Sequence, residues 1–245
     1  MKRVLMWTGC IVGILVIVLI ILGQFYPQTY LVAYSKFWYR ESRFPYMYVT
    51  PVPREINQSI KFIDYQDFSV LSLEFKVPWL ENVNTKEIGE DKLLKFDGSR
   101  GILVLKNAVD LREMILEQFS EQQQYNNGLS ERILGDSIKS RYEFNKAILN
   151  VTPNQIKLSD SRNEISKKWI LITAKLLSAS MLVKSGEKIY NFETPTMRGF
   201  QFGDPPNVIL SIFDNSDHQY DLLISGSNQD EIDFILSFIK PASNR

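Results

Sequence analysis

Residues 4–22 (VLMWTGCIVGILVIVLIIL) form an unbroken apolar run without one charged side chain. As an α-helix with a rise of about 1.5 Å per residue, this run would span the roughly 30 Å hydrocarbon core of a bilayer. It is longer than the apolar core of a cleaved signal peptide, and no A-x-A cleavage pattern follows it. We therefore predict an uncleaved transmembrane anchor over residues 1–24, which contacts the lipid bilayer through residues 4–23. A cleaved signal peptide and a buried soluble helix are the alternatives.

The charges that flank this run set the expected orientation. Lys2 and Arg3 precede it and favour a cytoplasmic N-terminus, because cytoplasmic flanks carry an excess of basic residues. Lys36, Arg40 and Arg43 lie on the opposite flank and weaken that bias. We predict a single-pass membrane protein whose C-terminal domain lies outside the cytoplasm, in the periplasm or in the extracellular space.

Composition excludes several kinds of site. Lys2 and Arg3 belong to the anchor, so the rest of the 245-residue chain has 26 of the 28 Lys/Arg against 28 Asp/Glu, a net charge of −2. A balance this close to zero predicts no nucleic-acid partner. Cys10 and His218 are the only residues of their types, and Cys10 lies in the apolar run. One chain therefore forms no disulfide and no site with several His or Cys ligands, and we predict no metal and no cofactor.

An aromatic-rich segment follows the anchor. Tyrosine and tryptophan recur every fourth residue, which would place them on one face of a short helix, at Tyr26, Tyr30, Tyr34 and Trp38. Such side chains prefer the headgroup layer, so we predict a collar at the membrane interface. Packing onto the folded domain and docking to another membrane protein are the alternatives. Residues 50–53 (TPVP) suggest an extended linker, so the predicted units are a membrane-proximal segment over 25–60 and a globular domain over 61–245.

Strands are predicted first in this domain. Apolar residues alternate with polar ones over residues 71–77, which is typical of a strand with one buried face, and Pro78 ends it. Residues 93–96 and 101–105 flank the sequence Asp-Gly-Ser-Arg and predict a hairpin, with Gly98 where a positive φ is needed.

Three helices should form the middle of the domain. Asp110 is placed to cap the first, with Glu113 three residues later as in a capping box. Ser130 opens a second helix, which Pro153 ends. Residues 161–183 predict the third from apolar residues at helical spacing, with three lysines on its solvent side: Lys167, Lys168 and Lys175.

Strands then return at residues 197–202, 208–213 and 220–224, the last two joined as a hairpin by a polar loop. Ser227 is placed to cap a closing helix with a stripe of apolar residues, Ile232, Ile235, Leu236 and Ile239. Because hairpins imply antiparallel pairing, the predicted class is α+β. The expected architecture is an N-terminal transmembrane helix followed by one antiparallel-sheet domain, in which two hairpin regions flank a helical middle and a C-terminal helix closes the fold.

Three polar segments are candidates for chemistry. Asp214, Asp217 and His218 have side chains that can hold a metal or transfer protons, but Asp in a hairpin loop is favoured for turn geometry alone. Residues 97–101 (DGSRG) resemble a phosphate-binding loop, yet a strand rather than a helix should follow them. Residues 199–206 (GFQFGDPP) would form either a ligand rim or a packed turn. We favour the turn interpretation for all three and assign no catalytic, cofactor-binding or metal-ligating residue.

The pattern of elements resembles the Mog1/PsbP-like α/β/α sandwich. The residues that carry the resemblance are the strand at Phe68–Val77 ending in Pro78, the turn at Phe96–Arg100, and the hairpin and helix over Val208–Ile239. The long helical middle departs from a compact version of that fold. The resemblance implies an architecture, and members of that broad class serve as binding or assembly domains.

An anchor, an aromatic juxtamembrane segment and no catalytic constellation together predict a non-enzymatic accessory domain that works by binding. A membrane protein is its expected partner. Two alternatives stay open, a membrane-tethered hydrolase with an unrecognised site and a carrier of lipids or small molecules.

Overall fold

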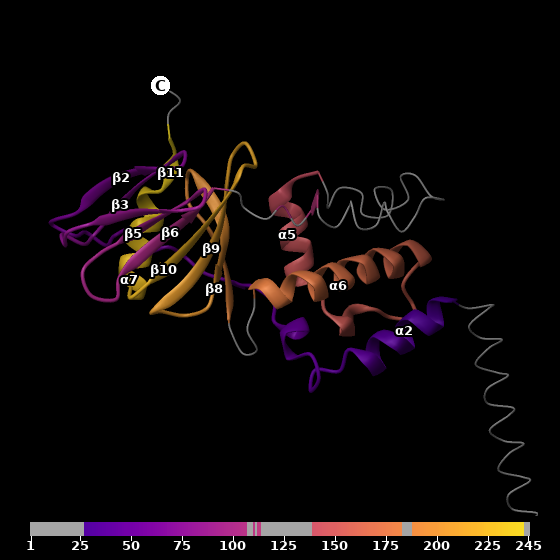
Figure 1. The fold of residues 1–245 in the computed structure, drawn as a ribbon. Coiled ribbons are helices and arrows are strands. Elements are labelled where there is room, and N and C mark those ends of the chain that lie inside the picture. Colours follow the sequence, from indigo (N-terminus) through magenta and orange to yellow (C-terminus); the bar gives the residue numbers. More distant parts are fainter. Residues whose placement is uncertain (1–26, 107–109, 111, 114–138, 183–187, 243–245) are drawn as a thin grey trace, which may run out of the picture.

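The computed structural model describes residues 27–106, 110, 112–113, 139–182 and 188–242. These residues form an α+β fold with a large mixed sheet, a small second sheet and four α-helices. Helices cover both faces of the large sheet (Figure 1). The predicted α+β class is therefore confirmed. No helix in the described part of the chain is long and apolar enough to cross a membrane, and the predicted anchor over residues 1–24 lies outside that part.

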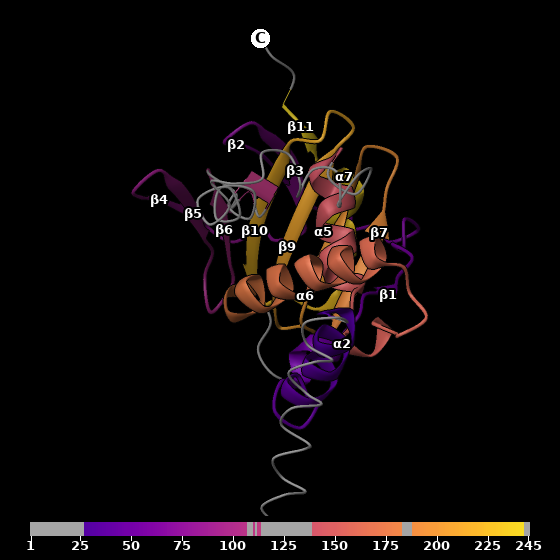
Figure 2. The same ribbon diagram turned by 90° about the vertical axis from the view of Figure 1, so that its right-hand side faces the viewer.

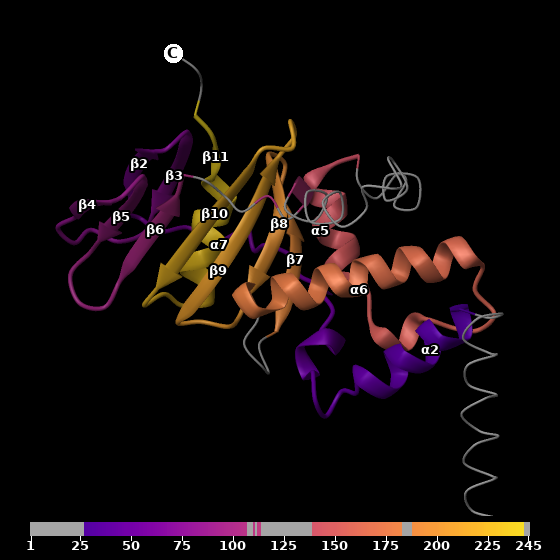
Figure 3. The ribbon, with the colours of Figure 1, turned by 45° about the vertical axis from the view of Figure 1, so that its right-hand side comes forward.

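The large sheet has the strand order β1-β7-β8-β9-β10-β6-β5-β4. Neighbouring strands in this sheet are antiparallel except for β1 and β7, which pair in parallel. The strands are β1 (Val52–Pro53), β4 (Asn84–Ile88), β5 (Asp91–Lys95), β6 (Gly101–Leu105), β7 (Ile189–Glu193), β8 (Met197–Phe202), β9 (Asn207–Asp214) and β10 (Gln219–Ser225). Figure 3 shows them side by side, from β4 at the far edge to β7 beside the helices. The predicted β5–β6 and β9–β10 hairpins and the strand at 197–202 are confirmed.

A second, three-stranded sheet has the order β11-β3-β2, with β2 (Gln66–Val70), β3 (Leu73–Val77) and β11 (Lys240–Pro241). The strand predicted over residues 71–77 is confirmed as β3, which begins two residues later. The continuous strand over Phe68–Val77 that supports the resemblance is wrong, because the chain reverses at Leu71 and Ser72, whose φ angles are +48° and +68°. Two consecutive left-handed residues make the tight turn that suits a two-residue hairpin. Leu71 packs against the core, and this burial offsets the roughly 1–2 kcal/mol that left-handed backbone costs a residue with a Cβ.

The described helices are α2 (Pro27–Trp38), α5 (Arg141–Asn150), α6 (Arg162–Leu182) and α7 (Gln229–Phe238), with 3₁₀ turns η1 (Pro45–Tyr48) and η3 (Pro153–Gln155). The predicted helices at 161–183 and at the C-terminus are confirmed. Asn228 rather than Ser227 caps α7, because its side chain accepts from the N–H of Glu231. Ser140 caps α5, whereas the predicted opening at Ser130 lies outside the described residues.

Apolar side chains fill three adjoining clusters. One face of the large sheet packs against α7 and the small sheet, and the apolar stripe of α7 is fully covered there. The opposite face packs its aromatic side chains from β8 and β9 against α5. A third cluster joins α2, η1, α5 and α6, and α6 lies between α5 and α2 in Figures 1 and 2. The fold therefore has a helical layer on each side of the sheet.

The membrane-proximal segment lies against the rest of the fold. Tyr34 packs edge-on against Trp169 of α6, with ring centroids 5.6 Å apart. Tyr30, Tyr34 and Trp38 stack along one face of α2, as the four-residue spacing predicts. The proposed linker at 50–53 is extended, but it contributes β1 to the sheet edge. Some of these rings therefore pack onto the domain, and others are exposed at its surface.

The prediction that Lys175 lies on the solvent side of α6 is wrong. Its expected place is the solvent side of the helix, but the side chain is only 2% exposed. Its ammonium donates to the carbonyl oxygens of Val49 at 2.8 Å, Leu149 at 2.8 Å and Val151 at 2.9 Å. A sequence pattern counts every lysine as hydrophilic and so predicts that it is exposed. The burial of Lys175 is explained by the three carbonyl oxygens that accept hydrogen bonds from its ammonium.

Candidate functional site

A pocket of about 710 Å³ lies where β1, β7 and the start of α5 meet. Its volume is within the roughly 300–1,000 Å³ range of ligand sites. Its walls are Pro53, Arg54, Glu55, Ile56, Gln58, Tyr142, Asn191, Phe192 and Glu193. We call it the β1–β7 pocket.

The sheet edge positions the chain that lines this pocket. Pro53 stands in the edge strand, where its missing N–H leaves no ladder bond unmade. The next residue continues the pairing, since the Arg54 N–H donates to the carbonyl of Asn191 at 2.9 Å. The following residues then run along the pocket wall instead of extending the strand.

Tyr142 and Phe192 are the aromatic side chains of the pocket, and Tyr142 also has a polar group. It is 6% exposed, its ring stacks on Phe200 with centroids 5.4 Å apart, and the Arg198 guanidinium lies 4.1 Å from the ring centre. Burial raises the pKa of its hydroxyl above the usual 10.0, with Arg198 opposing the shift and Glu193 adding to it. The hydroxyl therefore stays protonated at neutral pH. It makes no hydrogen bond within the described part of the chain.

The predicted polar cluster holds Tyr142 in place. The Asp217 carboxylate accepts from the N–H groups of Arg141 and Tyr142, the first two residues of α5. Asp217 itself has a positive φ of +67°, which Asp tolerates better than most residues. An acidic side chain at a helix N-terminus is favourable because it pairs unsatisfied N–H groups and complements the helix dipole. This loop residue therefore fixes the first turn of α5 to the sheet.

Asp214 and His218 shape the same loop. One Asp214 oxygen accepts from the N–H groups of Ser216 at 2.8 Å and His218 at 2.9 Å, and the other lies 3.0 Å from Nδ1 of His218. These are the contacts of a turn. No group of three or more His, Cys, Asp or Glu side chains among the described residues is placed to hold a metal ion.

The two glycine-containing segments also have structural contacts. Residues 97–101 form the β5–β6 turn, with φ of +76° at Gly98. In the second segment Phe200 and Phe202 are 1% and 2% exposed and pack under α5. Neither segment contributes a side chain to the β1–β7 pocket, whose lining comes from elsewhere.

A buried polar network holds Arg54, one of the residues that line the pocket. The Arg54 guanidinium donates through Nη1 to Oδ1 of Asp233 on α7, while the other oxygen of Asp233 accepts from the Asn57 N–H at 3.1 Å. Gln229 donates to the same carboxylate at 3.0 Å and also contacts Gln201. Asp233 therefore neutralises Arg54. The Nε and Nη2 atoms of Arg54 are buried and have no partner among the described residues.

Acidic side chains border the pocket on two sides. Glu55 follows β1 and Glu193 ends β7, and both are exposed. Neither forms an ion pair with the described residues, whereas the nearby Arg198 lies 3.9 Å from both Glu143 and Asp217. The amides of Gln58 and Asn191 also line the pocket. Positive groups lie beside this rim as well, because the ammonium of Lys146 is 5.6 Å from the Tyr142 ring centre and Arg198 is the cross-strand partner of Glu193.

A second candidate surface lies on α2. Tyr30, Phe37 and Trp38 are 60%, 66% and 42% exposed. Two guanidinium groups from the residues after α2 lie over two of these rings, that of Arg40 at 4.5 Å from the Phe37 centre and that of Arg43 at 4.7 Å from the Trp38 centre. We call these five residues the interfacial face. It combines large apolar area with positive charge.

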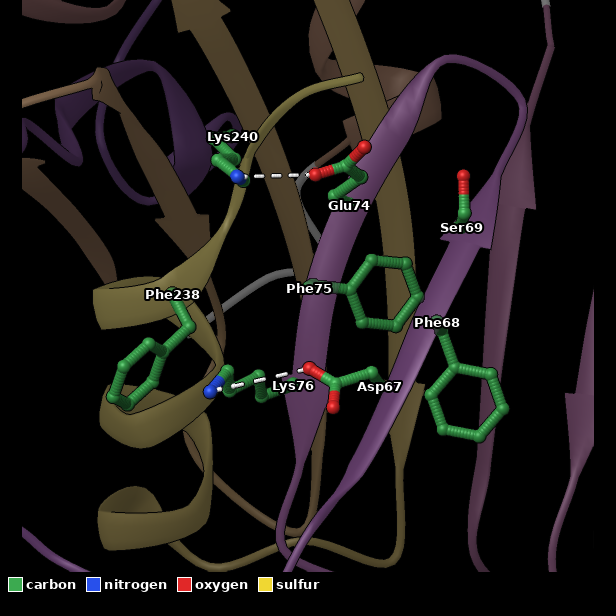
Figure 4. A pocket seen from close by; sticks show the side chains of 8 residues that line it. All are labelled: Asp67, Phe68, Ser69, Glu74, Phe75, Lys76, Phe238 and Lys240. Carbon is green, nitrogen blue, oxygen red and sulfur yellow. Dashed lines mark ion pairs between the residues drawn. The ribbon is translucent and has the colours of Figure 1, made fainter. Parts of the chain in front are cut away.

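A shallow groove of about 260 Å³ on the small sheet is the third candidate (Figure 4). Its charges already pair across strands, Lys240 with Glu74 at 3.1 Å and Lys76 with Asp67 at 4.0 Å. The Lys76 ammonium also lies 4.9 Å from the ring centre of Phe238. The groove's charged side chains therefore satisfy one another.

Sequence reasoning missed Arg54, Tyr142 and Glu193. They come from the chain after β1, from α5 and from β7, which are far apart in the sequence, and no local spacing connects them. Pro53 in an extended stretch was a usable signal, because proline within a sheet indicates an edge strand.

Comparisons with protein-family models, with curated proteins and with solved structures find no match for this chain. The resemblance to the Mog1/PsbP-like sandwich stays a prediction.

Proposed function

We propose that this chain is a single-pass membrane protein whose α+β domain is an accessory domain that works by binding, held against the bilayer by α2. The observation that carries the proposal is the interfacial face, Tyr30, Phe37, Trp38, Arg40 and Arg43. The tyrosine and tryptophan rings have polar tips, and they and the guanidinium groups favour the headgroup layer, where the apolar rings, that of Phe37 included, are buried and the charge stays hydrated.

The sequence before α2 supports a bilayer as the occupant of this face. The apolar run ends at Leu22 and α2 begins at Pro27. Five residue steps span at most about 18 Å even when fully extended, so α2 starts close to the headgroups of an anchored chain. Burial of a phenylalanine side chain contributes about 1.5–3 kcal/mol, and each arginine near an anionic surface adds about 1 kcal/mol.

An environment-sensitive fluorophore on the full chain in liposomes tests this placement. In a Cys10→Ser background, we expect a label at Phe37→Cys to shift to the blue and to be quenched by brominated lipid. Ile63→Cys is the matched control, because Ile63 is 96% exposed and lies outside the interfacial face. Equal emission from the two sites would refute the placement.

Topology is tested separately in intact cells. Ser216 lies in the exposed β9–β10 loop, so Ser216→Cys in the Cys10→Ser background should react with a membrane-impermeant reagent if the domain is outside the cytoplasm. Labelling only after lysis would reverse the proposed orientation. Purification in mild detergent tests the binding role. A domain that retains neither a partner nor a ligand would contradict this part of the proposal.

A further inference from the structure

Two arginines directly after α2 have hydrogen-bond donors that the fold does not use. Arg40 and Arg43 are exposed, and their guanidinium groups lie over the rings of Phe37 and Trp38. A contact of this kind uses the charge of the guanidinium group and leaves its N–H groups able to donate. Neither side chain forms a hydrogen bond or an ion pair among the described residues. These donors can therefore bind an acceptor outside the chain.

The turn after α2 fixes both arginines in place. The carbonyl oxygen of Arg40 accepts from the N–H groups of Arg43 and Phe44, both at 2.9 Å, so the chain reverses as soon as the helix ends. The ring of Phe44 packs against that of Tyr39, which is 7% exposed and contacts Trp169 of α6. Because this turn is packed onto the helical layer, its arginines lose little conformational entropy when they bind.

The charge of this segment favours an anion. Residues 27–44 contain three basic side chains, Lys36, Arg40 and Arg43, against the single acidic Glu41, a net charge of +2. Lys36 and Glu41 are exposed as well, and neither forms an ion pair among the described residues. A guanidinium group pairs with phosphate oxygens through two parallel N–H···O bonds and is less strongly hydrated than an ammonium. Phosphate is therefore the anion that this pair of arginines suits best.

The direction of the interfacial face decides where this phosphate comes from. Tyr30 and Phe37 are seven residues apart, almost two full helical turns, and both are exposed on one side of α2. The face therefore runs along most of the helix, which begins five residue steps after the apolar run. When the rings of this face are buried in a bilayer, the two arginines beside them reach the layer of lipid phosphates.

We propose that Arg40 and Arg43 bind the phosphate of an anionic phospholipid, with the rings of Phe37 and Trp38 inserted beside it. This inference rests on the proposed function, because it names the class of lipid that the interfacial face contacts. A zwitterionic lipid has the same phosphate, but its own ammonium group neutralises that charge. A surface with net positive charge therefore prefers a lipid with net negative charge.

The test measures which lipids gather around α2 in the full-length chain. In a Cys10→Ser background, a donor fluorophore is attached at Ala33→Cys, because Ala33 is exposed on α2 and lies outside the interfacial face. The liposomes are phosphatidylcholine with a trace of an acceptor lipid labelled on its acyl chain, either phosphatidylglycerol or phosphatidylcholine. We expect stronger energy transfer to phosphatidylglycerol. The excess should fall as salt is added, because ions screen exposed charges.

Matched variants locate the preference. Arg40→Gln and Arg43→Gln should each lower the association constant of phosphatidylglycerol relative to phosphatidylcholine by about two- to fivefold, the range expected for one basic side chain at a lipid surface. Replacing both arginines by lysine keeps the charge and should retain more of the preference than replacing both by glutamine. Lys86→Gln removes one positive charge from the exposed strand β4, far from α2 in Figure 3, and should leave the preference unchanged.

Equal energy transfer to the two acceptor lipids would overturn the proposal, and so would a loss of preference in Lys86→Gln as large as that in Arg40→Gln. Failure of the proposed function is a different result. The Phe37→Cys label in liposomes of phosphatidylcholine alone reports membrane placement without any anionic lipid.

Discussion

Replacement of Lys175 by methionine tests how the helical layer is held together. The lysine ammonium joins α6 to the end of α5 and to the chain after η1 through three carbonyl oxygens. The Leu149 carbonyl needs this donor, because residue 153, from which a continuing helix would supply an N–H, is a proline. Methionine has a similar length and volume but no donor, so Lys175→Met leaves these carbonyls unpaired without opening a large cavity.

The expected magnitude follows from two opposing terms. Three hydrogen bonds from a charged donor stabilise by about 5–9 kcal/mol. Burial lowers the pKa of Lys175 from 10.5 to about 8, which corresponds to a penalty of about 3 kcal/mol for holding the ammonium in the folded state. The bonds outweigh this penalty, so Lys175→Met should lower the free energy of unfolding by about 2–6 kcal/mol at neutral pH.

The pH dependence has a definite sign. Between pH 8 and 10.5 the folded state has released the Lys175 proton while the unfolded state still holds it, so the unfolded state binds more protons and stability rises with pH. Below pH 8 both states are protonated and this contribution is constant. The stability difference between wild type and Lys175→Met should therefore widen by up to about 3 kcal/mol across this window, and groups common to both proteins cancel.

Urea unfolding in mild detergent, followed by tryptophan fluorescence at pH 7 and pH 10, measures both effects. Lys167→Met is the matched control, because Lys167 lies on the same helix, is partly exposed, and its side chain has no hydrogen bond or ion pair among the described residues. If Lys175→Met were as stable as Lys167→Met, or if the difference did not change with pH, the carbonyl-capping explanation would be refuted.

Three further predictions concern the backbone. A Cβ at Gly199 would clash with the carbonyl oxygen of Ser211 on the next strand, so Gly199→Ala should lower stability by about 2 kcal/mol or more in thermal unfolding. Gly101→Ala is its control, since the nearest atom there is a movable side-chain oxygen at 3.3 Å. Asp217→Asn should cost about 1 kcal/mol through the weakened cap of α5, and unchanged amide exchange in the first turn of that helix would contradict it. Ser72→Gly should raise the melting temperature by a few degrees, because glycine accepts the φ of +68° without strain; a lower value would refute this.

Sequence patterns predicted the elements whose two faces differ in burial. The stripe of α7 and the alternation in β3 follow directly from which side chains are covered. Strand β4 has no buried side chain, so no period-two pattern marks it and it is held by backbone pairing with β5. The Leu71–Ser72 turn lacks Gly and Asn, the residues that usually indicate it.

Local sequence patterns could not predict the residues of the candidate site, and the cause is different. Arg54, Tyr142 and Glu193 come from the chain after β1, from α5 and from β7, and each has an unremarkable neighbourhood in the sequence. The pattern around Asp217 correctly suggested a turn. It did not reveal that the carboxylate caps a helix whose first residue lies 76 positions earlier in the chain.

By itself, the sequence determined the α+β class, the main hairpins, α6 and α7, because local periodicity records which side of an element is covered. It also contains the apolar run whose length matches a bilayer. Only the tertiary structure decided that Lys175 is buried, which rings of α2 stay exposed, and where a pocket opens. These properties depend on atoms brought together from distant positions, since a lysine is buried only where carbonyl oxygens converge on it and a pocket exists only between elements that have already packed.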